Sequence, residues 1–325
     1  MLLHARCAVS VLHRRTLVPV RRRPRALQRG VTLIELMVSM AIGLALVGAL
    51  VLTYLGNAQS TRTSMALTQM SEDGQAALAL MTQQLRQADY NPRLPAPAGV
   101  RDLQTGGFGL FACDAGFQSA SAAFASLQCN AGTGPAAMAV TYVADQFNTV
   151  PTSTTPPGPT DCVGAGVPPI TDASGAYYVV QNRFYVEGGN LMCAGNGATS
   201  PFTGAQPFVE NVDDLVVNFG VAAPVPPVGG VAGYMTAAQL GPVAGSSGVF
   251  NDADFMALAP AARWGRVLSV RVCVVMRSAG AVVPALESAP QHYIDCRGKK
   301  IRTVDGVLRR AFASTVLLRN RVTAS

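Results

Sequence analysis

The chain has 325 residues, enough for one or two domains with a sizeable core, and its formal net charge is +7. Eight arginines and no acidic residue fall within residues 1–30, which leaves 17 basic and 18 acidic side chains for the rest of the chain. This near-neutral balance gives little electrostatic support to nucleic-acid binding by the main body of the chain. No direct nucleic-acid partner is therefore predicted.

Residues 1–30 form a basic leader directly before a long apolar segment. Clustered arginines ahead of a first membrane helix keep that end of the chain in the cytoplasm. One alternative is a solvated or nucleic-acid-binding basic tail. Another is an ordinary secretory signal, although its apolar region is shorter and ends in small residues. A translation start downstream of Met1 is an alternative to so long a leader.

An uncharged stretch of 26 residues separates Glu35 from the next charged residue, Arg62. Its core, residues 36–55, is about as long as an α-helix needs to be to cross the hydrocarbon layer of a membrane. We therefore predict a transmembrane helix over residues 31–56. The glycines within it are well tolerated in membrane helices.

Beyond residue 56 the pattern stays helical but becomes amphipathic. Five apolar residues at roughly helical spacing would form one face: Met65, Met70, Leu78, Met81 and Leu85. We predict that residues 57–91 form an amphipathic helix whose apolar face packs on a globular head. Pro92 marks the expected end, because the residue before a proline avoids the helical region.

Residues 92–325 are predicted to form a β-rich periplasmic head. Five segments have the character of strands: residues 138–144, 177–186, 215–219, 267–276 and 312–318. The fourth is the clearest, because apolar residues alternate onto one face: Leu268, Val270, Val272, Val274 and Met276. Four tracts rich in Pro, Gly, Ser and Thr are predicted loops: residues 91–107, 150–169, 194–207 and 221–250. Loops of this length are either functional or simple surface insertions.

The cysteines indicate export. Apart from Cys7 in the leader, all of them follow the membrane segment: Cys113, Cys129, Cys162, Cys193, Cys273 and Cys296. Six cysteines beyond a membrane helix suit an oxidising compartment and up to three disulfides, for which fifteen pairings exist. We favour sequential pairing because each closed loop is then short. Zinc binding is disfavoured, since no two of them have the close spacing of metal ligands.

The segment Arg29-Gly30-Val31-Thr32-Leu33-Ile34-Glu35-Leu36 resembles the class III leader of type IV prepilins and type II secretion pseudopilins. In that family a membrane peptidase cuts after the glycine and methylates the new N-terminus. The resemblance implies cleavage between Gly30 and Val31, N-methylation of Val31, and a helix carboxylate at Glu35. Most relatives have phenylalanine where this chain has Val31.

Three segments in the C-terminal half, residues 209–215, 264–272 and 309–321, are similar to PilW-type minor pilins. The resemblance implies an α+β, type IV pilin-like fold, with a long N-terminal α-helix packed on an antiparallel β-sheet head with long loops. It also implies partners: the prepilin peptidase, other minor pilins, the major pilin and the pilus assembly platform. The chain would cross the inner membrane once, with its N-terminus cytoplasmic and its head periplasmic, before it enters the fibre near the tip.

Glu35 is the strongest candidate functional residue, with Thr32 beside it in the same motif. A carboxylate in a membrane helix costs roughly 1–3 kcal/mol. In a stack of subunits it can meet the charged amine of a neighbouring Val31, and each stabilises the ionised form of the other. The alternative is an interfacial glutamate that reaches the lipid headgroups. The predicted function is a minor pilin that initiates and assembles the pilus and so supports twitching motility, adhesion or DNA uptake.

Two other functions stay open: a J-type minor pseudopilin of a type II secretion system, and a signal-anchored periplasmic enzyme or binding protein. No catalytic, cofactor or metal site is predicted. His292 is the single histidine beyond the leader, and no nucleophile motif accompanies it. The acidic residues in 251–254 and 213–214 suit a polar turn or helix cap better than a calcium site. Trp264 is expected to open a strand and to belong to the core.

Overall fold

The computed structural model describes residues 30–92, 109–173, 175–197, 201–222, 230–241, 255 and 257–322. The chain divides into two units, one that ends at Leu55 and one that begins at Gly56. Helix α1, Leu33–Gln87, contributes residues to both. Most of the predicted loop at residues 91–107 lies outside the described residues, as do the acidic residues at 251–254.

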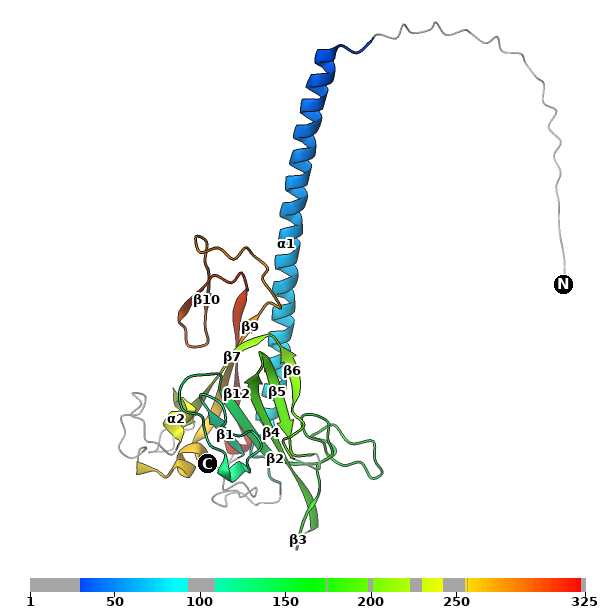
Figure 1. Ribbon diagram of the computed structural model, residues 1–325. Coiled ribbons are helices and arrows are strands. Elements are labelled where there is room, and N and C mark those ends of the chain that lie inside the picture. Colours follow the sequence, from blue (N-terminus) through cyan, green and yellow to red (C-terminus); the bar gives the residue numbers. More distant parts are fainter. Residues whose placement is uncertain are drawn as a thin grey trace, which may run out of the picture. The chain divides into compact units, whose positions relative to one another are not determined.

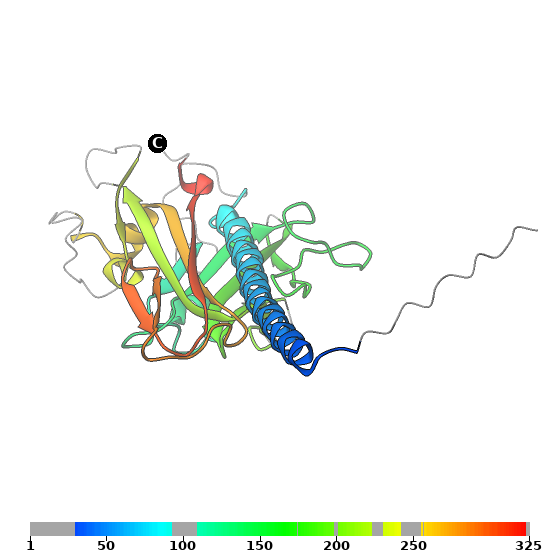
Figure 2. The ribbon, with the colours of Figure 1, turned by 90° about the horizontal axis from the view of Figure 1, so that it is seen from above.

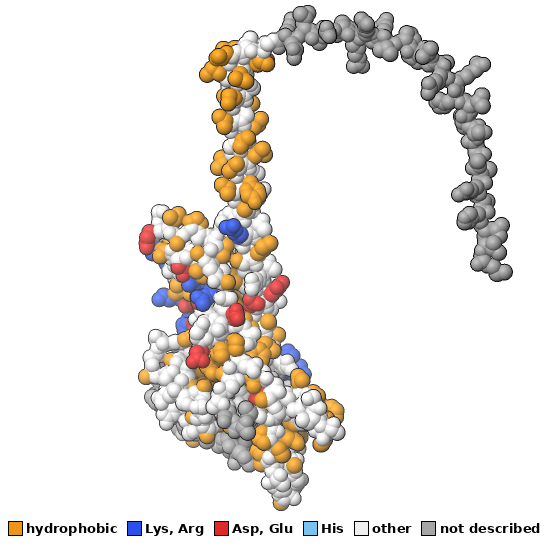
Figure 3. Space-filling model, turned by 45° about the vertical axis from the view of Figure 1, so that its right-hand side comes forward, with side chains coloured by type: hydrophobic (Ala, Val, Ile, Leu, Met, Phe, Trp, Pro, Cys, Tyr) orange, Lys and Arg blue, Asp and Glu red, His pale blue; other side chains and the backbone are white. Residues whose placement is uncertain are grey.

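In the first unit the face of α1 seen in Figure 3 is covered mainly by apolar side chains. Its large apolar side chains are exposed, from 50% at Val51 to 76% at Leu33. The hydroxyls of Ser39 and Thr53 donate back to main-chain oxygens of the preceding turn. The hydrogen-bonding groups of these two side chains are thus paired within the helix. Among the described residues, α1 is long and apolar enough to cross a membrane.

In the second unit α1 buries one face against the head. The buried positions follow a spacing of three or four residues: Met70, Gly74, Ala77, Met81 and Leu85. The predicted apolar face was partly wrong. Met65 is 67% exposed, and the small residues Gly74 and Ala77 are buried in this face instead. Gly74 is required there, since a Cβ atom at that position would lie 2.6 Å from the ring of Phe312. Figure 2 shows this helix against strands of the head.

Helix α1 ends at Gln87, before the predicted stop at Asn91-Pro92. Asp89 adopts a left-handed conformation with φ of 66°, which a continuing helix does not allow. Its N–H donates to the main-chain oxygen of Thr141 on the neighbouring sheet, at 3.0 Å. A tertiary hydrogen bond therefore terminates the helix earlier than the proline would.

The first sheet of the head is antiparallel, with the order β1-β2-β4-β5-β6, and β3 pairs with β4. The strands are β1 Leu110–Cys113, β2 Ala137–Ala144, β3 Ile170–Asp172, β4 Gly175–Glu187, β5 Asn190–Gly195 and β6 Gln206–Glu210. Strand β2 is buried along its whole length, which places it at the centre of the unit.

The second sheet is also antiparallel, with the order β12-β9-β7-β8. Its strands are β7 Val212–Ala222, β8 Val231–Met235, β9 Val267–Arg277 and β12 Arg309–Leu317. One residue, Asn211, joins β6 of the first sheet to β7 of the second, and its φ of 61° is left-handed. The chain thus changes sheets in a single residue, between the strands labelled β6 and β7 in Figure 1.

A β-hairpin and short helices complete the described head. The hairpin consists of β10 Gln291–Ile294 and β11 Lys300–Thr303. The helices are η1 Phe124–Ser126, α2 Ala237–Leu240, α4 Pro260–Gly265 and α5 Arg319–Val322. Strand β8 and helix α2 fall inside the tract at residues 221–250, so the prediction of one long loop there was wrong.

The predicted strands are confirmed, each within a few residues of its expected bounds, in β2, β4, β7, β9 and β12. In β9 the alternate residues Val270, Val272, Val274 and Met276 are buried in the main core, whereas Leu268 is only partly buried. The expected α+β architecture, a long helix with antiparallel sheets, is therefore the one observed.

One main core joins the buried face of α1 to the inner faces of both sheets. A smaller apolar cluster lies beneath the excursion between β1 and β2 and includes Phe117 and Phe124. Three disulfides hold the excursions of the head: Cys113–Cys129, Cys162–Cys193 and Cys273–Cys296. The six cysteines are thus paired in the order in which they occur.

Candidate assembly site at the start of the long helix

The described chain begins just before α1, and Thr32 caps the helix. The main-chain N–H of Glu35 donates to the Thr32 hydroxyl at 3.3 Å, and the N–H of Leu36 donates to the Thr32 carbonyl at 3.1 Å. The hydroxyl satisfies one of the N–H groups that a helix leaves unpaired at its start. Thr-x-x-Glu also has the sequence of a capping box, of which the structure shows the bond from the Glu35 N–H to the Thr32 hydroxyl.

Glu35 lies in the first turn of α1, where the helix dipole favours a negative charge. Glu35 is the single charged residue among the described residues 30–55. Among the described residues no ion pair involves Glu35. The carboxylate therefore has local support from the helix dipole and no countercharge.

Gly30 and Val31 precede the helix and are exposed. The side chain of Val31 is 70% exposed, and nothing lies within 4 Å of a Cβ atom placed on Gly30. The predicted processing and assembly residues thus share one short exposed segment. Within the described part of the chain, nothing packs closely enough to require a glycine at this position.

A clamp between the end of α1 and the end of the chain was not predicted from the sequence. The buried guanidinium of Arg321 pairs with the carboxylate of Asp89 at 3.0 Å and donates to the Trp264 carbonyl at 2.7 Å. Next to it, the Asn320 amide donates to the main-chain oxygens of Arg86 and Ala88. These carbonyls are the ones left open at a helix C-terminus. Two polar residues of α5 therefore complete α1.

A buried polar network fixes α1 on the first sheet. Gln84 of α1 accepts a hydrogen bond from the Asn182 amide of β4 at 2.7 Å and another from the Tyr142 hydroxyl of β2 at 3.3 Å. Burial raises the pKa of Tyr142 and keeps the hydroxyl protonated as a donor. Because hydrogen bonds require defined positions, this network sets the register of the helix on the sheet.

The adjacent acids Asp213 and Asp214 lie at the start of β7, and the predicted polar turn or helix cap is wrong for them. Asp213 pairs with Arg277 of β9 and Arg309 of β12, so it ties three neighbouring strands together. Asp214 pairs with Arg297 at 2.6 Å. Burial raises the pKa of Asp214, and the arginine opposes that effect. Both acids form ion pairs with arginines and stabilise the sheet.

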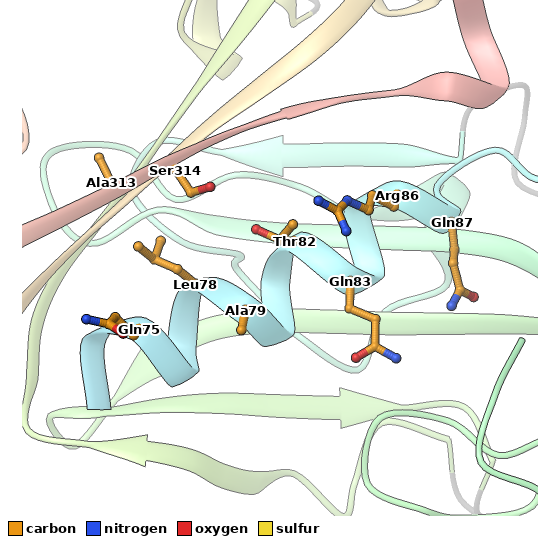
Figure 4. A pocket seen from close by; sticks show the side chains of 9 residues that line it. All are labelled: Gln75, Leu78, Ala79, Thr82, Gln83, Arg86, Gln87, Ala313 and Ser314. Carbon is orange, nitrogen blue, oxygen red and sulfur yellow. The ribbon is translucent and has the colours of Figure 1, made fainter. Parts of the chain in front are cut away.

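An open groove of about 760 Å³ lies between α1 and β12 (Figure 4). It is lined by Gln75, Leu78, Ala79, Thr82, Gln83, Arg86 and Gln87 from α1 and by Ala313 and Ser314 from β12. The lining is uncharged apart from Arg86, and it contains no acid, histidine or cysteine. The groove therefore offers a contact surface and no reactive group.

The remaining sequence candidates do not form a reactive site. His292 lies exposed on β10, opposite Arg302. Trp264 lies in α4, just before β9, and its ring contacts Phe219 at a centroid distance of 4.9 Å in the core. Within the described parts of the chain, no three His, Cys, Asp or Glu side chains are grouped as metal ligands.

Two family models match the chain. The model of the prokaryotic N-terminal methylation motif matches residues 25–51, the end of the leader and the start of α1. This match, the apolar helix and the antiparallel head define a type IV pilin-like protein. The model described as type IV pilus-assembly protein W matches residues 176–320, from β4 to α5. Together the two matches support a PilW-type minor type IV pilin.

Other comparisons add little to this assignment. A comparison with curated proteins finds no match. Among solved structures, the type IV-like pilin TTHA1219 from Thermus thermophilus is similar, with a TM-score of 0.35 and 10% sequence identity. The match covers 77% of this chain and 96% of that one. The two family models carry the assignment, and they imply processing by a prepilin peptidase and assembly with other pilins.

Proposed function

We propose that this minor pilin helps to initiate and assemble the type IV pilus at or near its tip. Glu35 is the observation that carries the proposal, because it is a lone carboxylate in the first turn of α1, whose residues 33–55 are otherwise uncharged and expose their large apolar side chains. A charge placed in an apolar environment is costly unless another charge compensates for it. In a fibre that compensation comes from a neighbouring subunit.

The compensating charge in the proposal is the N-terminal amine of a processed pilin. Cleavage between Gly30 and Val31 creates that amine, and methylation of Val31 leaves it cationic. The exposed segment at residues 30–32 supports this step, because a peptidase needs an accessible backbone. Each charge stabilises the other in a medium of low dielectric constant, so an incoming subunit is held in one axial position.

The proposed location follows from the same helix. Before assembly the chain crosses the inner membrane once, with residues 31–56 in the bilayer, the N-terminus cytoplasmic and the head, with residues 57–91 packed on it, periplasmic. Three disulfides in the head support an oxidising compartment. The proposed partners are the prepilin peptidase, the assembly platform, other minor pilins and the major pilin, and the fibre would serve twitching motility, adhesion or DNA uptake.

The first experiment is mass spectrometry of the N-terminal peptide from membrane and sheared-fibre fractions. We expect an N-methylated peptide that starts at Val31 in both fractions. An intact leader, or a cut beyond residue 55, would contradict the proposal and favour a signal-anchored periplasmic protein.

The second experiment separates charge pairing from helix capping at Glu35. Glutamine also serves in a capping box, so Glu35→Gln keeps the cap and removes only the charge. We expect normal processing but roughly a hundredfold less incorporation into fibres, the effect of leaving a neighbour's charge unpaired. The matched control, Thr32→Val, removes the cap and keeps the charge, and a lost cap costs only about 1 kcal/mol. Normal incorporation of Glu35→Gln would refute the docking role.

A further inference from the structure

The loop between β9 and β10 lies beside the first turn of the second unit. The Gln59 amide donates a hydrogen bond to the main-chain oxygen of Val282 in this loop. Gln59 follows Leu55, the last residue of the apolar stretch, by four residues, about 6 Å along a helix. In Figure 1 the loop leaves β9 and reaches α1 before it returns to β10. Residues 281–290 are called the collar loop below.

The collar loop has a defined conformation. The N–H groups of Val282 and Val283 both donate to the carbonyl of Gly306, at 2.9 and 3.2 Å. Gly306 has φ of +71°, and a Cβ atom there would lie 2.2 Å from the carbonyl oxygen of Val283, so only glycine fits. The disulfide Cys273–Cys296 joins β9 to the end of the hairpin that follows the loop. The exposed side chains are thus held in place.

The collar loop is mostly apolar and contains one charged residue. Its sequence is Ala-Val-Val-Pro-Ala-Leu-Glu-Ser-Ala-Pro, and Leu286 is 49% exposed. The single acid, Glu287, pairs with Arg302 of the hairpin at 3.1 Å. On α1 the nearby cation is Arg62, which is exposed and follows Leu55 by seven residues. An exposed apolar loop with an arginine beside it has the composition of a membrane–water interface.

We propose that the collar loop rests on the phospholipid surface while α1 is anchored in the membrane. Leu286 and the prolines enter the headgroup region, and Arg62 meets lipid phosphates. The inference rests on the proposed membrane anchoring of residues 31–56. Lipid is the expected contact of the collar loop, because the loop is bonded to α1 only four residues after the apolar stretch ends. Burial of the exposed half of Leu286 favours the resting position by about fivefold.

The resting position gives the loop a role before assembly. A head that rests on the lipid surface has fewer orientations than a head free in solution, and it presents the same face to neighbouring pilins in the membrane. Extraction of the subunit into a fibre then removes the collar loop from lipid.

The test uses tryptophan in the full chain, reconstituted in vesicles that contain phosphatidylglycerol and lipids brominated in the upper acyl chain. Bromine quenches tryptophan within close range. Three exposed positions are compared: Leu286→Trp in the collar loop, Leu46→Trp in the apolar stretch, and Phe147→Trp elsewhere on the head. Phe147 is a matched control because it is 87% exposed and its turn is joined to Gln87, at the other end of the helix in this unit. The native Trp264 is buried and gives a constant background.

We expect strong quenching of Leu286→Trp and Leu46→Trp and none of Phe147→Trp. If Leu46→Trp is quenched and Leu286→Trp is not, the collar loop does not touch lipid, although anchoring holds. If Leu286→Trp is instead shielded from solvent only in fibres, the loop contacts a neighbouring pilin. Equal quenching of Leu286→Trp and Phe147→Trp would show unspecific adsorption and overturn the proposal. If Leu46→Trp is not quenched, the anchoring itself fails, and the inference falls with it.

Discussion

The two halves of α1 differ in what covers their apolar side chains. In residues 33–55 every large apolar side chain is at least half exposed, and the helix needs only its own backbone hydrogen bonds. In residues 56–87 one face is buried on two sheets, and polar side chains fix the register and the end of the helix. The first half therefore needs a partner outside the chain, whereas the second finds its partner within it.

This contrast also separates the consequences of substitutions. A change in the second half alters the free energy of unfolding of a single subunit. A change in the first half leaves the free energy of unfolding of the isolated subunit unchanged. It affects only those states in which a membrane or neighbouring subunits cover the helix. Three sets of substitutions test this division.

The largest effect is expected for Arg321→Ala. Removal of the guanidinium leaves the buried carboxylate of Asp89 unpaired, which costs about 3–5 kcal/mol of the head's unfolding free energy. Chemical unfolding followed by circular dichroism of the full chain in micelles measures this loss. The control is Arg302→Ala, which breaks an exposed ion pair and costs about 1 kcal/mol or less. Equal losses for the two variants would argue against the clamp.

The most direct comparison makes the same substitution in both halves. Gly74→Val forces a side chain into the space of the Phe312 ring and is expected to destabilise the head by about 1–3 kcal/mol. Gly48→Val meets nothing within 4 Å and should leave the stability of the subunit unchanged. The same unfolding measurement applies to both. A loss at Gly48 as large as that at Gly74 would remove the distinction between the halves.

The smallest effect concerns pH and Asp73 on the second half. Burial raises the pKa of Asp73, and the neighbouring charges of Glu72 and Glu210 add to the shift. A carboxyl with a raised folded-state pKa stabilises the fold below its unfolded pKa, and this contribution is lost as pH rises through the folded value. Asp73→Asn should therefore be more stable than the native chain at neutral pH, and the difference should vanish as the pH falls below the unfolded-state pKa of about 4. A constant difference across that range would contradict this explanation.

Those parts of the fold that have a local cause were predicted from the sequence. Runs of β-branched and apolar residues predicted β2, β4 and β9, and the uncharged stretch predicted the apolar half of α1. Short strands such as β3 and β10 have no such run and form because a neighbouring strand pairs with them. The buried face of α1 was predicted incorrectly at Met65, because apolar spacing alone does not reveal that the Phe312 ring packs on Gly74.

The candidate site divides in the same way. Gly30, Val31, Thr32 and Glu35 are contiguous, so a motif of a few residues was enough to find them. The clamp joins Asp89 to Arg321, which are 232 residues apart, and a single sequence gives no signal that pairs them. Asp213 and Asp214 look like turn residues by type, and their partners on other strands reveal their role.

The clamp also has a consequence for the order in which this protein is made. Arg321 leaves the ribosome 232 residues after Asp89, and together with Asn320 it completes the end of the long helix. The long helix therefore stays unfinished at its C-terminal end until α5 has been synthesised. Chains released early by a premature stop codon lack this closure, so we expect proteases to distinguish them from finished subunits before either can enter a fibre.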